Sequence, residues 1–147
     1  MYIDETGIDQ YLYRRYGRAP RGLPVYGKIS GRKYERTSIV AGQCDKRIVA
    51  PLQYSGTMDS ALFVFWFRTM LLPSVRRGSV FVMDNARFHK KKVLCELAKA
   101  AGCSILFLPP YSPDLNPIEH FWAWLKKKLR RILLSFDSLD DAISACF

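Results

Sequence analysis

Three stretches of this sequence decide its fold: Val80-Phe81-Val82-Met83-Asp84-Asn85, then Ile105-Leu106-Phe107-Leu108, then Asn116-Pro117-Ile118-Glu119. The first two are short apolar runs rich in β-branched and aromatic residues, and a helical pattern lies between them. This order is typical of a β-α-β unit with a buried parallel sheet. Asp84 then lies where the first strand ends, at the carboxyl edge of the sheet, where open α/β folds place their chemistry.

The third stretch brings a second carboxylate to the same edge. Asn116 followed by Pro117 predicts a helix start, with Asn116 as the N-cap and Pro117 as the first helical residue. Glu119 then falls in the first turn of that helix. A third carboxylate, Asp4, lies in the short run at the beginning of the sequence. If that run is the neighbouring central strand, Asp4 lies beside Asp84.

Three carboxylates from distant parts of the chain would therefore converge at one sheet edge. Oxygen ligands of this kind suit hard divalent cations better than they suit a proton-transfer pair. Two such ions can activate a water or a 3′-hydroxyl and stabilise the leaving oxygen in phosphodiester chemistry. The sequence thus predicts two Mg²⁺ (or Mn²⁺) ions held by Asp4, Asp84 and Glu119.

Each of these acidic residues also has a purely structural interpretation. Glu119, counted as the third helical position, could complete a capping box, and Asp84 could be a turn residue after a strand. Asp4 could be a surface residue at a strand edge. Glu5 points to the opposite face by strand alternation and is the weaker candidate. The spacing, the shared sheet edge and the motif described next together favour the metal site.

The sequence resembles the catalytic domain of DDE transposases at three places: Ile3-Asp4-Glu5-Thr6-Gly7, Met83-Asp84-Asn85-Ala86-Arg87-Phe88-His89, and Pro109-Pro110-Tyr111-Ser112-Pro113-Asp114-Leu115-Asn116-Pro117-Ile118-Glu119. The branch it resembles is the bacterial insertion-sequence relatives of mariner elements, which have a ribonuclease H-like fold. Thirty-four residues, 85 to 118, separate Asp84 from Glu119, and that branch uses this spacing.

The resemblance implies an enzyme that nicks DNA at a transposon end and then joins the freed 3′-hydroxyl to target DNA. It also includes Asn85 and His89 in the motif. His89 is five residues past Asp84 and is expected near the site, holding water, phosphate or a carboxylate; a histidine satisfied at a helix start is the alternative. Asn116 is best explained as the cap, and Asp114 as a turn residue.

The charge of the chain is consistent with a nucleic-acid partner. Among its 147 residues, 23 are Lys or Arg and 13 are Asp or Glu, which gives a net charge of +10. Such an excess is typical of proteins that bind polyanions. Arginines interleaved with tyrosines suit phosphate contact plus stacking, although a solvated loop explains them equally well. The candidate DNA-binding residues are Arg14, Arg15, Arg18 and Arg21, with Lys126 and Arg130 on the Glu119 side of the last long helix.

We expect one α/β domain over residues 1–147, with a mixed five-stranded sheet and helices on both faces. A hairpin is expected over 34–54 with its turn at Asp45-Lys46, and helices from a cap at Thr57, over 89–101, from Pro117 and over 137–147. The four cysteines form no CxxC pair and are expected as free thiols in core positions. No signal peptide or membrane-spanning run is apparent, so a bacterial cytosolic protein associated with the nucleoid is expected.

The sequence departs from the family pattern at its beginning. Full-length relatives carry N-terminal helix-turn-helix modules, whereas this sequence starts on the first catalytic strand. We therefore expect a split-gene product, a trimmed protein or a decayed copy, with a separate or missing helix-turn-helix region. The resemblance implies a homodimer on paired transposon ends. Two alternatives are an inactive remnant that only binds DNA, and a ribonuclease H-like nuclease.

Overall fold

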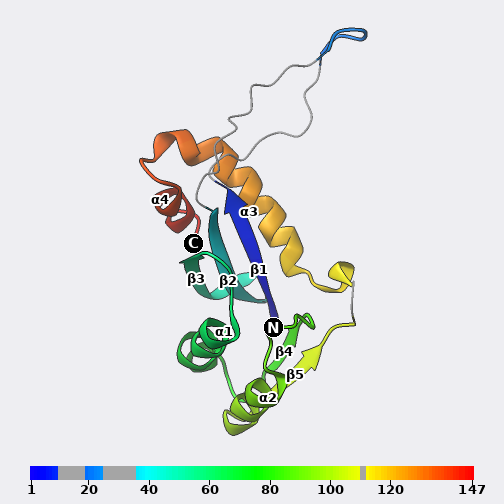
Figure 1. The fold of residues 1–147 in the computed structure, drawn as a ribbon, viewed down its shortest axis with the longest axis vertical. Helices are drawn as coiled ribbons and strands as arrows, with labels where there is room; N and C mark the ends of the chain where they lie inside the picture. Colours follow the sequence, from blue (N-terminus) through cyan, green and yellow to red (C-terminus); the bar gives the residue numbers. More distant parts are fainter. Residues whose placement is uncertain (10–18, 25–35, 110–111) are drawn as a thin grey trace.

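Five strands form one mixed sheet in the order β3-β2-β1-β4-β5 (Figure 1). The computed structural model describes residues 1–9, 19–24, 36–109 and 112–147. The first three strands pair antiparallel, whereas β1, β4 and β5 run parallel. The mixed five-stranded sheet predicted from the sequence is confirmed. The strands are β1 (Tyr2–Asp9), β2 (Arg36–Cys44), β3 (Arg47–Ser55), β4 (Val80–Met83) and β5 (Ser104–Phe107).

The hairpin of β2 and β3 turns where the sequence predicted. Asp45 and Lys46 both have positive φ, at 48° and 66°, as the two-residue turns that match strand twist require. The register of the two strands shifts between Val40 and Gly42, opposite Ala50, whose φ is 51°. Pro51 is tolerated beside this irregularity because β3 is an edge strand.

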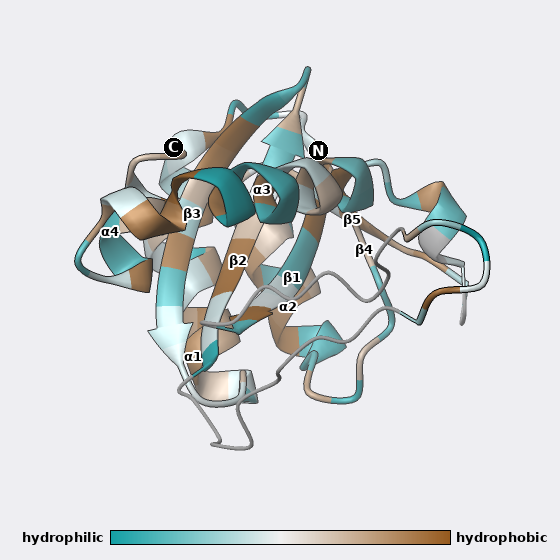
Figure 2. Cartoon of the chain, turned by 90° about the horizontal axis from the view of Figure 1, so that it is seen from above, coloured by the Kyte–Doolittle hydropathy of each residue, from teal (hydrophilic) through white to brown (hydrophobic). Residues whose placement is uncertain are grey.

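Helices cover both faces of the sheet, as predicted. The α-helices are α1 (Ser60–Trp66), α2 (Lys91–Ala100), α3 (Ile118–Ile132) and α4 (Leu139–Ser144). A wider π turn over Phe67–Leu71 and a 3-10 turn over Leu72–Ser74 extend α1, and further 3-10 turns span Pro113–Leu115 and Leu133–Ser135. Figure 2 shows α3 crossing over the central strands of the sheet.

Helix starts are set by side chains that pattern reading only partly identified. The cap of α1 is Asp59, whose carboxylate accepts from the Leu62 backbone N–H at 2.8 Å, so the prediction of Thr57 was wrong. Ser138 caps α4 as expected near its predicted start, accepting from the Asp141 N–H at 3.1 Å. Gly102, with φ of +72°, follows the C-terminus of α2 in the left-handed conformation that glycine often adopts at the end of a helix.

Two hydrophobic clusters hold the layers together, one on each face of the sheet. The first packs Phe63, Trp66 and Phe67 from α1 and its extension against Ile3 of β1. The second includes Trp122, Leu125 and Leu129 of α3 together with Ile8 of β1. Because successive strand residues point to opposite faces, β1 contributes Ile3 to one cluster and Ile8 to the other. The alternation also separates the two acidic neighbours Asp4 and Glu5.

The cysteines are free thiols, as predicted, but they are more exposed than predicted. All four thiols are free, but Cys44 and Cys95 are exposed and Cys103 and Cys146 are only partly buried, so none fills a core position. Across the described ranges, no helix is both long and apolar enough to cross a membrane.

Candidate active site

The sheet brings Asp4 and Asp84 to adjacent positions on neighbouring strands. β1 and β4 run parallel, with Tyr2 opposite Val82, and the Val82 N–H donates to the Met1 carbonyl at 2.8 Å. Asp4 lies two residues past Tyr2, inside β1, and Asp84 lies two residues past Val82, just after the last residue of β4. The predicted placement of Asp84 at the end of this strand is confirmed, but the strand is only half buried, with Phe81 and Met83 inside and Val80 exposed.

Asp4 is a mostly buried carboxyl that faces α3. The Trp122 indole Nε1–H donates to its Oδ2 at 3.1 Å. The pKa of Asp4 is raised to about 7, mainly by burial and also by the charges of Glu119 and Asp84, against the lowering effect of hydrogen bonds from the Glu5 backbone and Trp122. The influence of Glu119 on this pKa shows that the first turn of α3 lies within electrostatic reach of Asp4.

Asp84 is held by a histidine from the loop that follows β4. His89 Nε2 lies 3.0 Å from Asp84 Oδ1, and the Ala86 backbone N–H donates to the same oxygen at 3.2 Å. The hydrogen bond from His89 is the main cause that lowers the pKa of Asp84. The imidazole is buried between the rings of Phe63 and Phe88, whose centroids lie 4.3 and 4.4 Å away. His89 therefore contacts Asp84, a candidate metal ligand, and is not only a histidine satisfied at a helix start.

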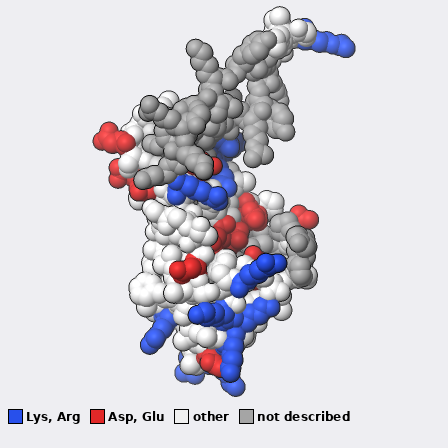
Figure 3. Space-filling view, viewed as in Figure 1, with Lys and Arg blue, Asp and Glu red and all other residues white. Residues whose placement is uncertain are grey.

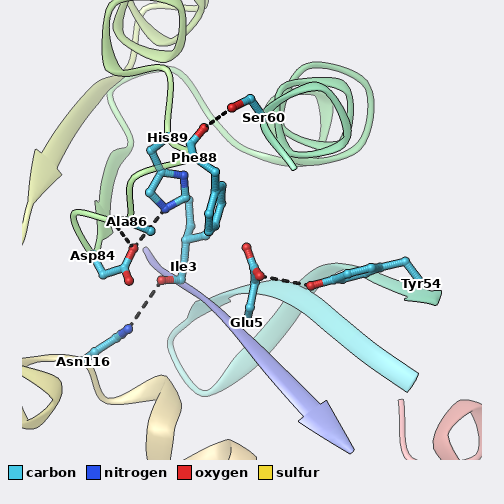
Figure 4. A network of polar contacts seen from close by, with 9 residues as sticks. All are labelled: Ile3, Glu5, Tyr54, Ser60, Asp84, Ala86, Phe88, His89 and Asn116. Atoms are coloured by element: carbon cyan, nitrogen blue, oxygen red, sulfur yellow. Dashed lines mark hydrogen bonds and ion pairs between the residues drawn. The ribbon is translucent and has the colours of Figure 1, made fainter. Parts of the chain in front are cut away.

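Glu119 is exposed in the first turn of α3, near the position expected. Pro117 has helical backbone angles (φ −58°, ψ −19°), as predicted for the first helical residue. The Asn116 side-chain oxygen, however, is buried and accepts no hydrogen bond from the described residues, so Asn116 does not cap the helix as predicted. Instead the buried Asn116 amide Nδ2–H donates to the Ile3 carbonyl at 3.4 Å (Figure 4). This bond joins the start of α3 to β1 one residue before Asp4. A buried amide that ties two elements together could not be distinguished from a cap by sequence pattern.

Glu5 belongs to this region although the sequence made it the weaker candidate. It points to the α1 face, as alternation predicted, and its Oε2 accepts from the Tyr54 hydroxyl at 3.0 Å. Its Oε1 is buried without a hydrogen-bond partner. The pKa of Glu5 is raised to about 7, mainly by burial and also by the charges of Asp4 and Asp84. Figure 4 shows Glu5 on the same side as His89 and Phe88.

A small pocket of about 170 Å³ joins these groups. It is lined by Ile3, Asp4, Glu5, Phe63, Asp84, Phe88 and His89. Figure 3 shows carboxylates gathered near the middle of this face, with Lys and Arg side chains below them. Within the described part of the chain, however, no three His, Cys, Asp or Glu side chains are grouped closely enough to hold a metal ion.

The remaining predicted residues are placed as follows. Asn85 is exposed beside Asp84, and Asp114 is exposed in the 3-10 turn before α3. On α3, Lys126 is half-buried, and Arg130, His120 and Trp124 are exposed. Arg21 is exposed. Arg14, Arg15 and Arg18 lie outside the residues that the structure describes.

Similarity to known proteins identifies the family of this chain. The family model described as DDE superfamily endonuclease matches residues 1–142. The chain belongs to this superfamily. The Tc1 transposase of Caenorhabditis elegans is 35% identical over 103 residues, which cover 67% of this chain and 36% of that protein. The chain thus spans about a third of the length of this relative.

Two solved structures of Mos1 transposase show the same fold. A paired-end complex with the left transposon end has a TM-score of 0.73 and 17% sequence identity, covering 99% of this chain and 45% of that one. A Mos1 paired-end complex with Mn has a TM-score of 0.67 and 17% identity, covering 99% and 46%. The likeness over almost the whole chain confirms the ribonuclease H-like architecture.

Proposed function

We propose that this chain is the catalytic domain of a transposase, which cuts a DNA strand and joins the freed 3′ end to target DNA. The observation that carries the proposal is the position of Asp4: a partly buried carboxyl on β1, beside the strand that ends at Asp84, with its pKa raised by burial and by the charges of Glu119 and Asp84. A folded protein seldom keeps a buried acid beside other acids unless a cation or a proton compensates them.

The side-chain oxygens of these residues are of the kind that suits a divalent ion, although among the described residues the acidic side chains are not grouped closely enough to hold one as they stand. Asp4, Asp84 and Glu119 offer the oxygen ligands that Mg²⁺ and Mn²⁺ prefer, and Glu5 adds a buried oxygen that has no partner. The Mos1 paired-end complex with Mn supports the same class of ion. A divalent ion bound there would polarise a phosphoryl oxygen and lower the pKa of an attacking hydroxyl or water. We propose two such ions, as in the family that the sequence resembles.

The protein's own side chains position the ligands. The Trp122 indole fixes one oxygen of Asp4, and His89 fixes one oxygen of Asp84, so each carboxylate keeps its second oxygen for a ligand. Asn116 anchors the start of α3 to β1, which holds the Glu119 backbone beside the strand that carries Asp4. Phe63 and Phe88 pack around the imidazole of His89 and limit the access of water on that side.

DNA is the partner that we propose for the basic surface. The excess of ten positive charges favours a polyanion, and the transposon end in the Mos1 complex is DNA. Exposed Arg21 and Arg130 and the half-buried Lys126 could contact the backbone. Arg14, Arg15 and Arg18 remain proposed contacts from the sequence alone.

The finer assignments rest on the sequence motif. We propose that residues 1–147 form a single catalytic domain of the bacterial insertion-sequence branch of mariner relatives, because the stretch ending at Glu119 and the 34-residue spacing match that branch. A homodimer on paired ends, a separate helix-turn-helix region and a location in the bacterial cytoplasm on the nucleoid complete the proposal.

Nicking of supercoiled plasmid DNA tests the activity. With Mg²⁺ or Mn²⁺ the wild type should convert supercoiled plasmid to the open circular form, and Asp4→Asn, Asp84→Asn and Glu119→Gln should each abolish this. Glu96→Gln, which changes an exposed acid on α2, is the matched control and should nick normally. Binding of DNA without metal-dependent nicking by the wild type would instead identify an inactive remnant.

A further inference from the structure

A second polar hollow lies on the α1 face of the sheet, on the other side of Glu5 from the candidate active site. It has a volume of about 290 Å³, and its walls include Gly7, Arg36, Ser38, Tyr54 and Thr57. Glu5 lines both this hollow and the pocket that contains Asp4, Asp84 and His89. The two cavities are therefore neighbours along β1.

The hollow depends on a glycine. Gly7 lies opposite Ser38, and Arg36 begins β2 opposite Asp9, so the arginine side chain reaches back across β1. A Cβ atom added to Gly7 would overlap the guanidinium of Arg36, at its Nε, Nη2 and Cζ atoms. Any side chain at position 7 would thus displace the guanidinium from the strand surface. Gly7 is needed for this close approach, not for a special backbone angle.

The guanidinium has no acidic partner in the ranges that the structure describes. The one ion pair found there joins His89 and Asp84. The carboxylate that lines the hollow belongs to Glu5. One of its oxygens accepts a hydrogen bond from the hydroxyl of Tyr54, on β3. Asp9, which lies opposite Arg36 in the strand register, forms no ion pair with it. An exposed arginine that is packed on a strand beside polar groups, and that has no ion-pair partner among the described residues, is suited to an anion from outside the chain.

We propose that this hollow, formed by Arg36 on Gly7 with the Thr57 hydroxyl at its wall, binds one backbone phosphate of the DNA strand next to the bond that is cut. The inference rests on the proposed function, because the anion is assigned from the DNA substrate. Gly7 is three residues past Asp4 on β1, about 10 Å along an extended strand, and it lies on the α1 face with Glu5, whereas the Asp4 side chain contacts α3. A strand with one phosphate at the carboxylates could therefore place a nearby phosphate against Arg36.

The salt dependence of DNA binding tests this site. Fluorescence anisotropy of a labelled mixed-sequence duplex is measured over a range of NaCl concentrations in EDTA. Arg36→Gln should weaken binding about tenfold at low salt and reduce the slope of log K against log salt by about 0.9. Gly7→Ala should produce the same change although it removes no charge. Arg47→Gln, which removes an equal charge from the exposed far end of the hairpin, should leave the slope unchanged.

Phosphate substitution makes the test specific. In the same assay, uncharged methylphosphonates replace single phosphates of the duplex in turn. For the wild type, one substituted position should weaken binding, and Arg36→Gln should be insensitive at that same position. Unchanged circular dichroism spectra and melting temperatures establish that the variants are folded; Arg36→Met, which is also uncharged, is the substitute if Arg36→Gln is not.

The outcomes separate this site from the proposed function. If the wild type binds DNA but Arg36 and Gly7 variants keep its slope and its methylphosphonate pattern, the phosphate site is refuted while the transposase proposal stands. If Gly7→Ala behaves as the wild type while Arg36→Gln does not, the charge of Arg36 contributes to DNA binding without its packing against Gly7. That result also overturns the proposal. If the wild type shows no salt-dependent DNA binding, both proposals fail.

Discussion

Replacing Asp4 by asparagine is expected to stabilise the metal-free protein at neutral pH. The folded-state pKa of Asp4 is about 7, against an ordinary value of 3.8 for the unfolded chain, mainly because the carboxyl is buried. Between these pH values the folded protein holds a proton that the unfolded chain has lost. The free energy of unfolding therefore falls as pH rises from about 4 to about 7, and the loss is complete above the folded-state pKa.

The magnitude follows from the pKa difference. About three pH units at about 1.4 kcal/mol each give an upper limit of about 4 kcal/mol, and partial solvent access reduces this to about 2–4 kcal/mol. Asparagine keeps an oxygen that can accept the Trp122 indole N–H, and it has no charge to bury. The variant should therefore keep the hydrogen bond from Trp122, and its free energy of unfolding should not fall through this position as the pH rises.

Urea unfolding in EDTA, followed by tryptophan fluorescence, measures the effect at pH 4 and pH 8. Asp4→Asn should match the wild type at pH 4 and exceed it by about 2–4 kcal/mol at pH 8. Asp9→Asn, an exposed position on the same strand, is the control and should change little. Equal destabilisation of Asp4→Asn at both pH values would show that Asp4 is an ordinary polar residue, and would refute the reasoning.

Two further predictions concern the side chains that position the ligands. His89→Leu removes the hydrogen bond that lowers the Asp84 pKa, so the pKa of Asp84 in a carboxyl-carbon NMR titration should rise; an unchanged titration would contradict the assigned contact. Asn116→Leu leaves the Ile3 carbonyl without its donor and should lower the free energy of unfolding by about 1–3 kcal/mol. Plasmid nicking by this variant should fall more than its folded fraction explains, because the start of α3 carries Glu119; normal nicking would show that the bond to Ile3 does not position it.

The elements that the sequence predicted best are those specified by local chemistry. The apolar run before Asp84, rich in β-branched and aromatic residues, forms the strand that was predicted, and the turn at Asp45-Lys46 follows from the spacing of two strand patterns. The alternation along β1 correctly separated Asp4 from Glu5. Such features depend on residues that are close in sequence, so a single sequence contains them.

The features that the sequence could not give depend on contacts between distant residues. The bonds from Trp122 to Asp4 and from Asn116 to Ile3 join residues that are 118 and 113 positions apart. Asn116 before a proline has the pattern of a cap, and only the packed structure shows that its amide is turned to β1 instead. Glu5 was undervalued for the same reason, because Tyr54 and His89 approach its face from other strands and loops.

Mn²⁺ titration by calorimetry, on the wild type and on Asp84→Asn with a DNA duplex present and absent, tests the central claim most directly. If the carboxylates of β1, β4 and α3 form a divalent-metal site, the wild type should bind Mn²⁺ in at least one of the two conditions, and Asp84→Asn should lose that binding. If the wild type binds no Mn²⁺ even with DNA, or if Asp84→Asn binds it equally well, the claim that these carboxylates form a metal site is contradicted.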